Sequence, residues 1–351
     1  MRSPNARPLV DYFATGGTIA SVRDEHTVGA TPTLTAKDIA ESAHGVSEVA
    51  ALRAIQFSQQ PSSSLTVHDL LRMRDEMAAR VDDGVRGFVV SQGTDTIEET
   101  AFVLDLLWDD DAPVVVTGAM RNPSAPGADG PANLLAAVHV AAHDAARGLG
   151  CLVVLNDEIH AARYVRKAHT FSPSAFQSPL AGPVGWVVEG RPVIAARPVG
   201  RVHLSLPTES RIPPVALIRV GLDDDGRLLR RLTELGFAGV VIEAFGGGHV
   251  TPAMVPLIAD LVAEMPVALA SRTGVGEVLS STYTFPGSEI ELMELGVIRV
   301  GALDSLKARL LLAMSLARGD MRDDTARLFR DVGATSGPVT GGSGSARGQS
   351  P

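Results

Sequence analysis

Hydroxyl side chains stand next to glycines at two places in the sequence where they could do chemistry. Thr15-Gly16-Gly17-Thr18 directly follows an apolar run, and Gly93-Thr94-Asp95-Thr96 follows another. Glycines in such turns let the backbone present N–H groups, which stabilise a phosphate or a developing oxyanion. A hydroxyl beside these donors is a candidate nucleophile once a base activates it. A tight turn without chemistry explains the first motif equally well, and neither motif has dinucleotide or P-loop spacing.

Two charged residues, Asp95 and Lys167, could serve such a hydroxyl. Asp95 directly follows Thr94 and could hold a substrate ammonium group or orient a base. Lys167 could act as the base if it were desolvated beside a hydroxyl, as in other Ser/Thr–Lys pairs. Lys167 also lies in the charged segment 163–169, where a solvated lysine is the simpler interpretation. The residues alone leave both interpretations open.

Other polar residues are weaker candidates for a binding site. Ser62 and Ser63 precede an expected helix, where serine hydroxyls and N–H groups suit a carboxylate, although a plain loop is an equal interpretation. His26, His249 and Glu289 are expected in surface loops. No HxxxH, HExxH or clustered acidic spacing is present, so no catalytic metal is expected.

The elements that must position these side chains follow from short apolar runs that alternate with helical segments. Continuous apolar runs joined by helices are typical of parallel strands buried on both faces. The runs cover residues 9–14, 87–91, 114–116 and 151–155, and then 215–220, 239–244, 267–271 and 297–300. In open α/β sheets ligands bind beyond the carboxyl ends of the strands, so the turns there are expected to form one site. In the first set these turns are 15–18, 91–96, 118–120 and 156–157.

Three threonines are expected to start helices. Thr35 and Thr66 each have an acidic residue three positions later. Thr96 and Glu99 have the spacing of a capping box, in which each side chain accepts a hydrogen bond from the other residue's backbone.

The pattern predicts an α/β protein with two domains. Residues 1–198 are expected to form a larger N-terminal domain with a mainly parallel sheet and flanking helices. Residues 199–214, with several prolines and charges, are expected to be a linker. Residues 215–334 are expected to form a smaller C-terminal α/β domain with its own parallel sheet. The Gly/Ser-rich tail 335–351 is expected to be disordered.

The composition excludes several classes of protein. The chain has 351 residues, 45% apolar and 20% charged, which allows a large core and argues against general disorder. Its formal net charge of −9 is unfavourable for a nucleic-acid partner. A single cysteine, Cys151, allows neither an intrachain disulfide nor a cysteine-rich zinc site. Without a signal-like start or a membrane-spanning stretch, the chain is expected in the cytoplasm with no membrane partner.

Four motifs, in this order, resemble those of the bacterial-type L-asparaginase and glutaminase-asparaginase family. They are residues 14–20, residues 93–100, residues 118–121 with 128–134, and residues 153–157 followed by Lys167. The resemblance spans roughly residues 9–330. It implies an amidohydrolase that converts the small molecule L-asparagine to L-aspartate and ammonia without a cofactor. One methylene is discriminated by only about 1–3 kcal/mol, which leaves room for minor glutaminase activity.

The resemblance also implies roles for the residues at matching positions. Thr18 is similar to the family's nucleophile, which would form a β-aspartyl ester. Thr94, Lys167 and Asp95 resemble a supporting triad that would activate either the hydroxyl or the hydrolytic water. The backbone N–H of Thr94 would contribute to an oxyanion hole.

Substrate binding and assembly are implied in the same way. Ser62 and Ser63 align with positions that hold the substrate α-carboxylate, and Asp95 would hold the α-ammonium group. Glu289 aligns with a carboxylate that reaches a neighbouring subunit's site, which implies at least a dimer, with a tetramer as the family precedent. His249, near the same amino-acid end of the pocket, stands where relatives have an asparagine.

The chain departs from the family pattern beside the proposed nucleophile. Gln92 replaces a histidine that often precedes the second motif. The loop at 21–29 is short and lacks the tyrosine that many members place next to the nucleophile, and His26 stands near that place. The group that activates Thr18 is therefore open.

Two other functions compete with the asparaginase interpretation. A non-catalytic amino-acid sensor could use the same cleft, although the retained Thr18, Thr94, Asp95 and Lys167 argue against it. The amidase subunit of a tRNA-dependent amidotransferase is an alternative, but such relatives carry an added N-terminal domain, whereas the first strand is expected near Leu9.

Overall fold

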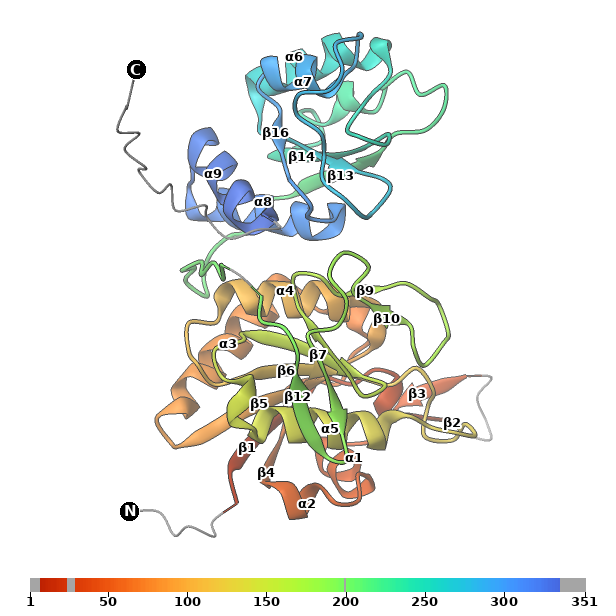
Figure 1. Ribbon diagram of the computed structural model, residues 1–351, viewed down its shortest axis with the longest axis vertical. Coiled ribbons are helices and arrows are strands. Elements are labelled where there is room, and N and C mark those ends of the chain that lie inside the picture. Colours follow the sequence, from red (N-terminus) through yellow and green to blue (C-terminus); the bar gives the residue numbers. More distant parts are fainter. Residues whose placement is uncertain (1–6, 24–28, 199, 335–351) are drawn as a thin grey trace, which may run out of the picture.

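The computed structural model describes residues 7–23, 29–198 and 200–334. His26 and the Gly/Ser-rich tail 335–351 lie outside the described residues. Figure 1 shows two domains arranged along the long axis, the larger one containing the N-terminal part of the chain. The segment 200–214 between them contains no helix or strand.

The described part of the N-terminal domain is built on an eight-stranded sheet. In spatial order its strands are β12 (Arg191–Ile194), β11 (Gly185–Val188), β8 (Glu158–Ala161), β7 (Cys151–Leu155), β6 (Val114–Thr117), β5 (Val85–Ser91), β1 (Leu9–Ala14) and β4 (Ala51–Gln56). The strands from β7 to β4 run parallel, whereas β8, β11 and β12 continue the sheet with antiparallel pairing. Burial of β6 and β7 along their whole length explains their continuous apolar sequences.

Helices cover both faces of this sheet (Figure 1). Phe13 and Phe88 pack on the face covered by α3 (Val67–Val81) and α4 (Ile97–Leu107), whereas Tyr12 packs on the opposite face. That second face is covered by α1 (Ala36–Ser42), α2 (Val46–Val49) and α5 (Gly130–Ala142). Neighbouring residues of β1 thus serve opposite cores, as the two-residue period of a strand requires.

The C-terminal domain has a smaller sheet of its own. Its parallel strands are β13 (Val215–Arg219), β14 (Gly239–Ala244), β15 (Val267–Ser271) and β16 (Ile298–Arg299), in that order. Its helices are α6 (Val255–Glu264), α7 (Glu289–Glu294), α8 (Ser305–Arg318) and α9 (Arg322–Gly333). The predicted fold class, a large mainly parallel sheet plus a smaller parallel α/β domain, is confirmed.

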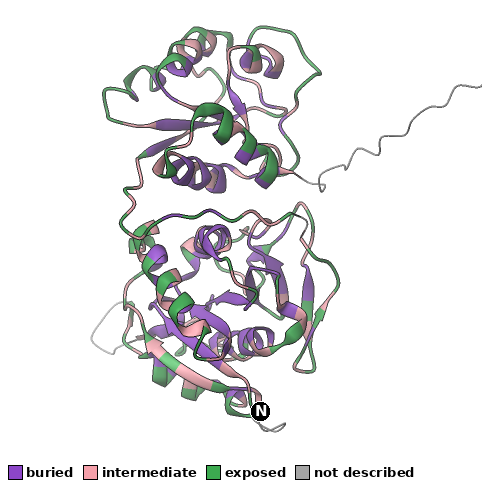
Figure 2. Ribbon diagram, turned by 90° about the vertical axis from the view of Figure 1, so that its left-hand side faces the viewer, coloured by how far each residue is buried: buried purple, intermediate pink, exposed green. Residues whose placement is uncertain are grey.

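The helix α8 connects the two cores. It packs against α4, and its residues Leu311 and Ala313 belong to the same buried cluster as Val103 and Leu107 of α4. Figure 2 shows buried residues along both sheets and on the inner sides of the helices. The C-terminal domain therefore rests on the helix that follows the Gly93-Thr94-Asp95 motif.

The predicted caps are confirmed at two helices and wrong at the third. Thr35 and Thr66 form capping boxes with Asp38 and Asp69. Thr96 caps nothing, because α4 is entered through a 3-10 turn, η3 (Thr94–Thr96), in which Thr96 lacks the extended backbone of an N-cap. No helix in the described ranges is long and apolar enough to cross a membrane.

Candidate active site

Two glycines shape the turn that carries Thr18, at the carboxyl end of β1. Gly16 and Gly17 have φ values of 110° and 83°, in the left-handed region that favours glycine. A Cβ on Gly17 would lie 2.1 Å from the backbone nitrogen of Gly93. The backbones of the two motifs are therefore in direct contact, and each contact residue immediately precedes a candidate threonine, Thr18 or Thr94.

A third segment, the 3-10 turn η2 (Ser62–Ser64), closes against the same place. A Cβ on Gly93 would lie 2.8 Å from Ser62 Oγ. The hydroxyl of Thr96 donates to the Ser62 carbonyl oxygen at 3.1 Å, which is the bond it makes in place of the predicted cap. Ser62 is buried and Ser63 is exposed. The structure thus brings Thr18, Thr94 and Ser62 to one edge of the sheet.

Lys167 joins this group from a distant part of the chain. It lies on β9 (Arg166–Lys167), which pairs with β10 (Phe176–Gln177). Its Nζ donates to Thr94 Oγ1 at 2.9 Å and to Asp95 Oδ1 at 2.6 Å. The Lys167 side chain is only 15% exposed, whereas that of Asp95 is 75% exposed. The interpretation of Lys167 as a solvated surface charge is therefore wrong.

The surroundings of Thr18 differ from those of Thr94. Thr18 begins the 3-10 turn η1 (Thr18–Ala20) and is partly buried. Within the described ranges no hydrogen bond to its hydroxyl is found, and His26 lies outside them. Gln92 is fully buried, and its Nε2 donates to Gly93 O at 3.3 Å and to Thr96 Oγ1 at 3.2 Å. The Gln92 side chain therefore braces the turn before Thr94, and its hydrogen bonds go to this turn rather than to Thr18.

Asp129 and Asn133 hold the third and fourth motifs together. The Asp129 carboxylate accepts from the backbone N–H groups of Met120 and Arg121 at 3.0 and 2.8 Å. Asn133 donates to Gly118 O at 3.0 Å and accepts from the Asn156 N–H at 2.9 Å. Sequence reasoning left these two residues without a role. Their polar side chains at the start of an otherwise apolar helix were the available signal.

His249 and Glu289 meet each other in the C-terminal domain. Glu289 Oε1 accepts from the N–H groups of Thr282 and Tyr283 at 2.8 and 2.9 Å, and its Oε2 lies 3.1 Å from His249 Nε2. Burial raises the pKa of Glu289, but the backbone hydrogen bonds and His249 outweigh it and hold the pKa below its ordinary value. The expected surface loop is wrong for Glu289, which is fully buried and is the first residue of α7.

Within the described residues, neither the His249–Glu289 pair nor a metal-binding cluster is joined to the two threonine turns. No hydrogen bond or ion pair among them connects His249 or Glu289 to Thr18 or Thr94 of the same chain. In the part of the chain that the structure describes, no three His, Cys, Asp or Glu side chains gather as a metal site requires.

Comparisons with known proteins show which family the chain belongs to. Residues 10–200 match the family described as "Asparaginase, N-terminal", and residues 214–329 match "Glutaminase/Asparaginase C-terminal domain". The chain belongs to the asparaginase family. Family members named L-asparaginase and glutaminase-asparaginase, which are amidohydrolases, are similar in sequence to this chain over most of its length.

Three relatives illustrate the similarity within the asparaginase family. An L-asparaginase of Bacillus licheniformis is 34% identical over 311 residues, which cover 88% of this chain and 95% of the relative. A glutaminase-asparaginase of Pseudomonas fluorescens biotype A is 31% identical over 91% of this chain and 89% of its own length. The crystal structure of a probable cytoplasmic L-asparaginase from Campylobacter jejuni superposes with a TM-score of 0.83 and 28% identity. That match covers 92% of this chain and 99% of the other.

In this asparaginase-family chain an acidic residue lies buried behind the Thr94 turn. Glu98, in the first turn of α4, is buried, and its Oε2 has no hydrogen-bond partner among the described residues. Burial raises the pKa of Glu98 to about 7, with Lys307 acting in the opposite direction. The carboxyl of Glu98 is therefore largely protonated below neutral pH.

Proposed function

We propose that this chain hydrolyses the side-chain amide of L-asparagine to give L-aspartate and ammonia. The observation that carries the proposal is the geometry of Lys167, whose Nζ is hydrogen-bonded to both Thr94 and Asp95. This group adjoins Gly93, which packs against the glycine preceding Thr18. Two hydroxyls, a lysine and a carboxylate at one sheet edge are the components of acyl transfer through a hydroxyl nucleophile.

The proposed reaction has two steps, with Thr18 as nucleophile. Thr18 Oγ1 attacks the amide carbon and loses its proton, and the amide nitrogen takes up a proton and leaves as ammonia. Water then attacks the β-aspartyl ester, and its proton returns to Thr18 Oγ1. The Thr94–Lys167–Asp95 group supplies acid–base chemistry to one of these steps. The N–H of Thr94 supports an oxyanion hole at the turn that Gln92 braces.

The amino-acid end of the substrate would be held by residues of opposite character. Asp95 presents a largely exposed carboxylate, which suits the α-ammonium group. Ser62 and Ser63, at the start of a 3-10 turn, suit the α-carboxylate. Glu289 and His249 would reach the same end from a neighbouring subunit, in a dimer or tetramer. We further propose a cytoplasmic location, a minor glutaminase activity and no cofactor.

Ammonia release from L-asparagine tests the proposal. Thr18→Ala should lower kcat by about 10³-fold or more, because the nucleophile is removed. Thr208→Ala, which removes a hydroxyl that donates to Asp75 far from these turns, is the matched control and should keep full activity. Mass spectrometry of quenched reactions should detect an aspartyl adduct on Thr18. Absence of ammonia release from the unmodified chain would favour the sensor interpretation.

A further inference from the structure

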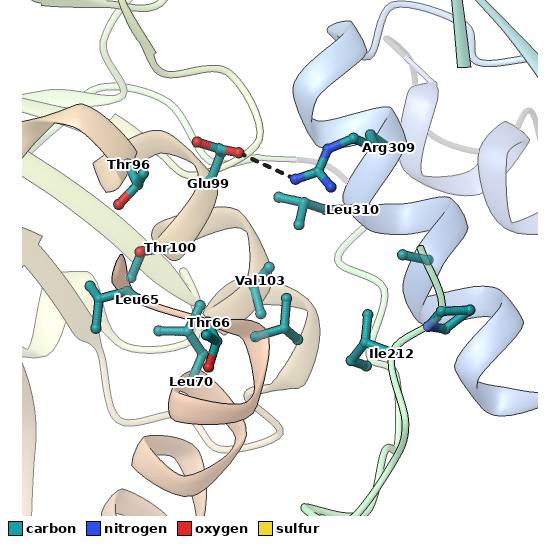
Figure 3. Close-up of a pocket in the computed structure, with 13 residues that line it drawn as sticks. Leu65, Thr66, Leu70, Thr96, Glu99, Thr100, Val103, Ile212, Arg309 and Leu310 are labelled. Atoms are coloured by element: carbon teal, nitrogen blue, oxygen red, sulfur yellow. Dashed lines mark ion pairs between the residues drawn. The ribbon is translucent and has the colours of Figure 1, made fainter. Parts of the chain in front are cut away.

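A cavity of about 250 Å³ lies between the two domains, beside the proposed active site. Figure 3 shows its walls, which come from α3 and α4 on one side and from α8 and the segment before β13 on the other. Most of the wall is apolar. Its apolar residues include Leu65, Leu70, Val103, Ile212, Leu310 and Ala313.

Opposite charges stand on this otherwise apolar wall. Arg309 Nη2 and Glu99 Oε1 are 3.8 Å apart, and their side chains are 35% and 22% exposed (Figure 3). This separation is too long for a direct hydrogen bond. Among the described residues Arg309 donates no hydrogen bond, whereas the partly buried Arg201 and Arg272 donate to backbone carbonyls. Arg309 therefore keeps unused donors, whose fork geometry fits a carboxylate.

We infer that this cavity binds a small α-amino acid with a branched apolar side chain. Its α-carboxylate would pair with Arg309 and its α-ammonium group with Glu99, and its side chain would pack among the leucine, valine and isoleucine side chains. Both charges of the ligand are then compensated, as burial of a zwitterion requires. A purely apolar ligand would give Arg309 and Glu99 no new hydrogen-bond partner. A polar side chain such as that of asparagine would find no hydrogen-bond partner among the apolar residues of the wall.

An occupant would contact the segment that carries Ser62. Leu65 and Thr66 line the cavity and directly follow the turn Ser62–Ser64. Thr96 also lines it, and its hydroxyl holds the Ser62 carbonyl oxygen. A ligand that fills the cavity would restrict this segment and so favour the geometry that receives the substrate α-carboxylate. This kinetic consequence rests on the proposed function, whereas binding itself does not.

Calorimetric titration of the full chain with L-leucine tests the binding. L-Aspartate at saturating concentration should be present, so that binding of leucine at the active site is suppressed. We expect saturable binding that Arg309→Met weakens at least tenfold. Arg318→Met, on the same helix with 34% side-chain exposure, should leave binding unchanged. Absence of binding, or equal binding by Arg309→Met, would overturn the inference.

Two leucine analogues test the recognition of each charge. 4-Methylpentanoate lacks the ammonium group and so cannot pair with Glu99. Glu99→Gln should therefore weaken the binding of 4-methylpentanoate less than it weakens the binding of leucine. 3-Methylbutylamine lacks the carboxylate and should be insensitive to Arg309→Met. Binding of the amine as tight as that of leucine would contradict a carboxylate contact at Arg309.

Initial rates of ammonia release test the coupling to the active site. Saturating L-leucine should lower KM for L-asparagine about fivefold, at the lower end of typical allosteric couplings, with kcat unchanged. The effect should disappear in Arg309→Met. Leucine binding with an unchanged KM would contradict the coupling, whereas leucine binding without any ammonia release would contradict the proposed function instead.

Discussion

Lys307 of α8 donates a hydrogen bond to the carbonyl oxygen of Val165 at 2.5 Å. Val165 lies only two residues before Lys167 in the sequence. Lys307 Nζ also lies 3.3 Å from Arg163 O and 3.1 Å from Asp304 Oδ2. The side chain is fully buried, so these three contacts replace its hydration. The C-terminal domain therefore fixes the path of the segment that leads to the proposed catalytic lysine.

Lys307→Met should lower both stability and turnover. Breaking a buried ion pair by removing one partner costs about 3–5 kcal/mol, because Asp304 and two carbonyl oxygens lose their donor. In protein that remains folded, kcat should fall more than KM rises, because Lys167 loses its position and Ser62 does not. Urea unfolding and steady-state kinetics check this. Lys37→Met, at a side chain 79% exposed, is the control, and equal kcat values in both variants would refute the positioning role.

Substitution of Lys167 should separate catalysis from stability. Lys167→Met removes the hydrogen bonds to Thr94 and Asp95, and kcat should fall by about 10²–10⁴-fold, as for loss of an acid–base group. Lys167→Arg keeps the charge but does not deprotonate at neutral pH, so it should be as inactive as the methionine variant. Melting temperatures of both variants should stay close to that of the unmodified chain. High activity in the arginine variant would show that only charge is required.

Gly17→Ala should disrupt the contact between the two threonine turns. The added Cβ would meet the Gly93 backbone, and the residue would keep a strained φ of 83°. A cost of at least about 2 kcal/mol in unfolding free energy is expected, together with loss of activity. Gly221→Ala is the control, because a Cβ there meets nothing within 4 Å. Chemical unfolding of both variants measures the difference, and equal stabilities would refute the close contact.

Glu98 should make stability depend on pH. Its pKa rises from an ordinary value of 4.5 to about 7 on folding, so the folded state holds this proton more tightly than the unfolded state. The stabilisation of the folded state by this proton is fully present below about pH 4.5 and is lost as pH rises through about 7. At roughly 1.4 kcal/mol per pKa unit it amounts to about 3 kcal/mol. The charged groups that act on Glu98 are Lys307, Asp304, Arg166 and Glu99.

Glu98→Gln isolates this effect from other titrations. The glutamine stays neutral, so the stability of the unmodified chain should fall relative to the variant between pH 5 and pH 8. Urea midpoints across that range measure the difference. Parallel pH profiles for the two proteins would show that folding does not raise the pKa of Glu98.

Mixing the Glu289→Gln and Thr18→Ala variants tests whether Glu289 acts in a neighbouring subunit. Glu289→Gln keeps an acceptor for the Thr282 and Tyr283 N–H groups, so the fold should be retained while KM for L-asparagine rises. If chains exchange with Thr18→Ala chains, one site of each mixed dimer regains both native residues. After random exchange of equal amounts, half of the dimers are mixed and each has one native site, so about a quarter of the native activity should return at low substrate. No recovery after verified subunit exchange would place Glu289 outside the partner's site.

The sequence predicted the buried parallel strands well because their burial leaves a local signal. Residues 9–14, 151–155, 239–244 and 267–271 are strands with the predicted bounds. The parallel edge strand β4 and the antiparallel strands β8, β11 and β12 were missed. They carry polar or exposed residues instead of a continuous buried apolar run, and their partners are set by tertiary contacts.

Long-range contacts also explain which site residues resisted prediction. The bonds from Lys167 to Thr94 and Asp95 span more than 70 residues, and nothing in the charged segment around Lys167 indicates its burial. Thr96 has a capping-box spacing, but its hydroxyl holds a carbonyl 34 residues away. Local patterns identified the reactive residue types, whereas their geometry depends on packing between distant segments.

The contact between Lys307 and Val165 also determines at which stage of its synthesis the chain can hold Lys167 in position for catalysis. Domains fold as units, and the N-terminal one emerges first from the ribosome. Residues 163–167 are then already available, but the ammonium group that fixes them is translated about 140 residues later. A truncated product ending before α8 would carry every proposed catalytic side chain and yet lack the support for Lys167. Lys167 is therefore held in its catalytic position only after α8 has been synthesised and has packed against the N-terminal domain.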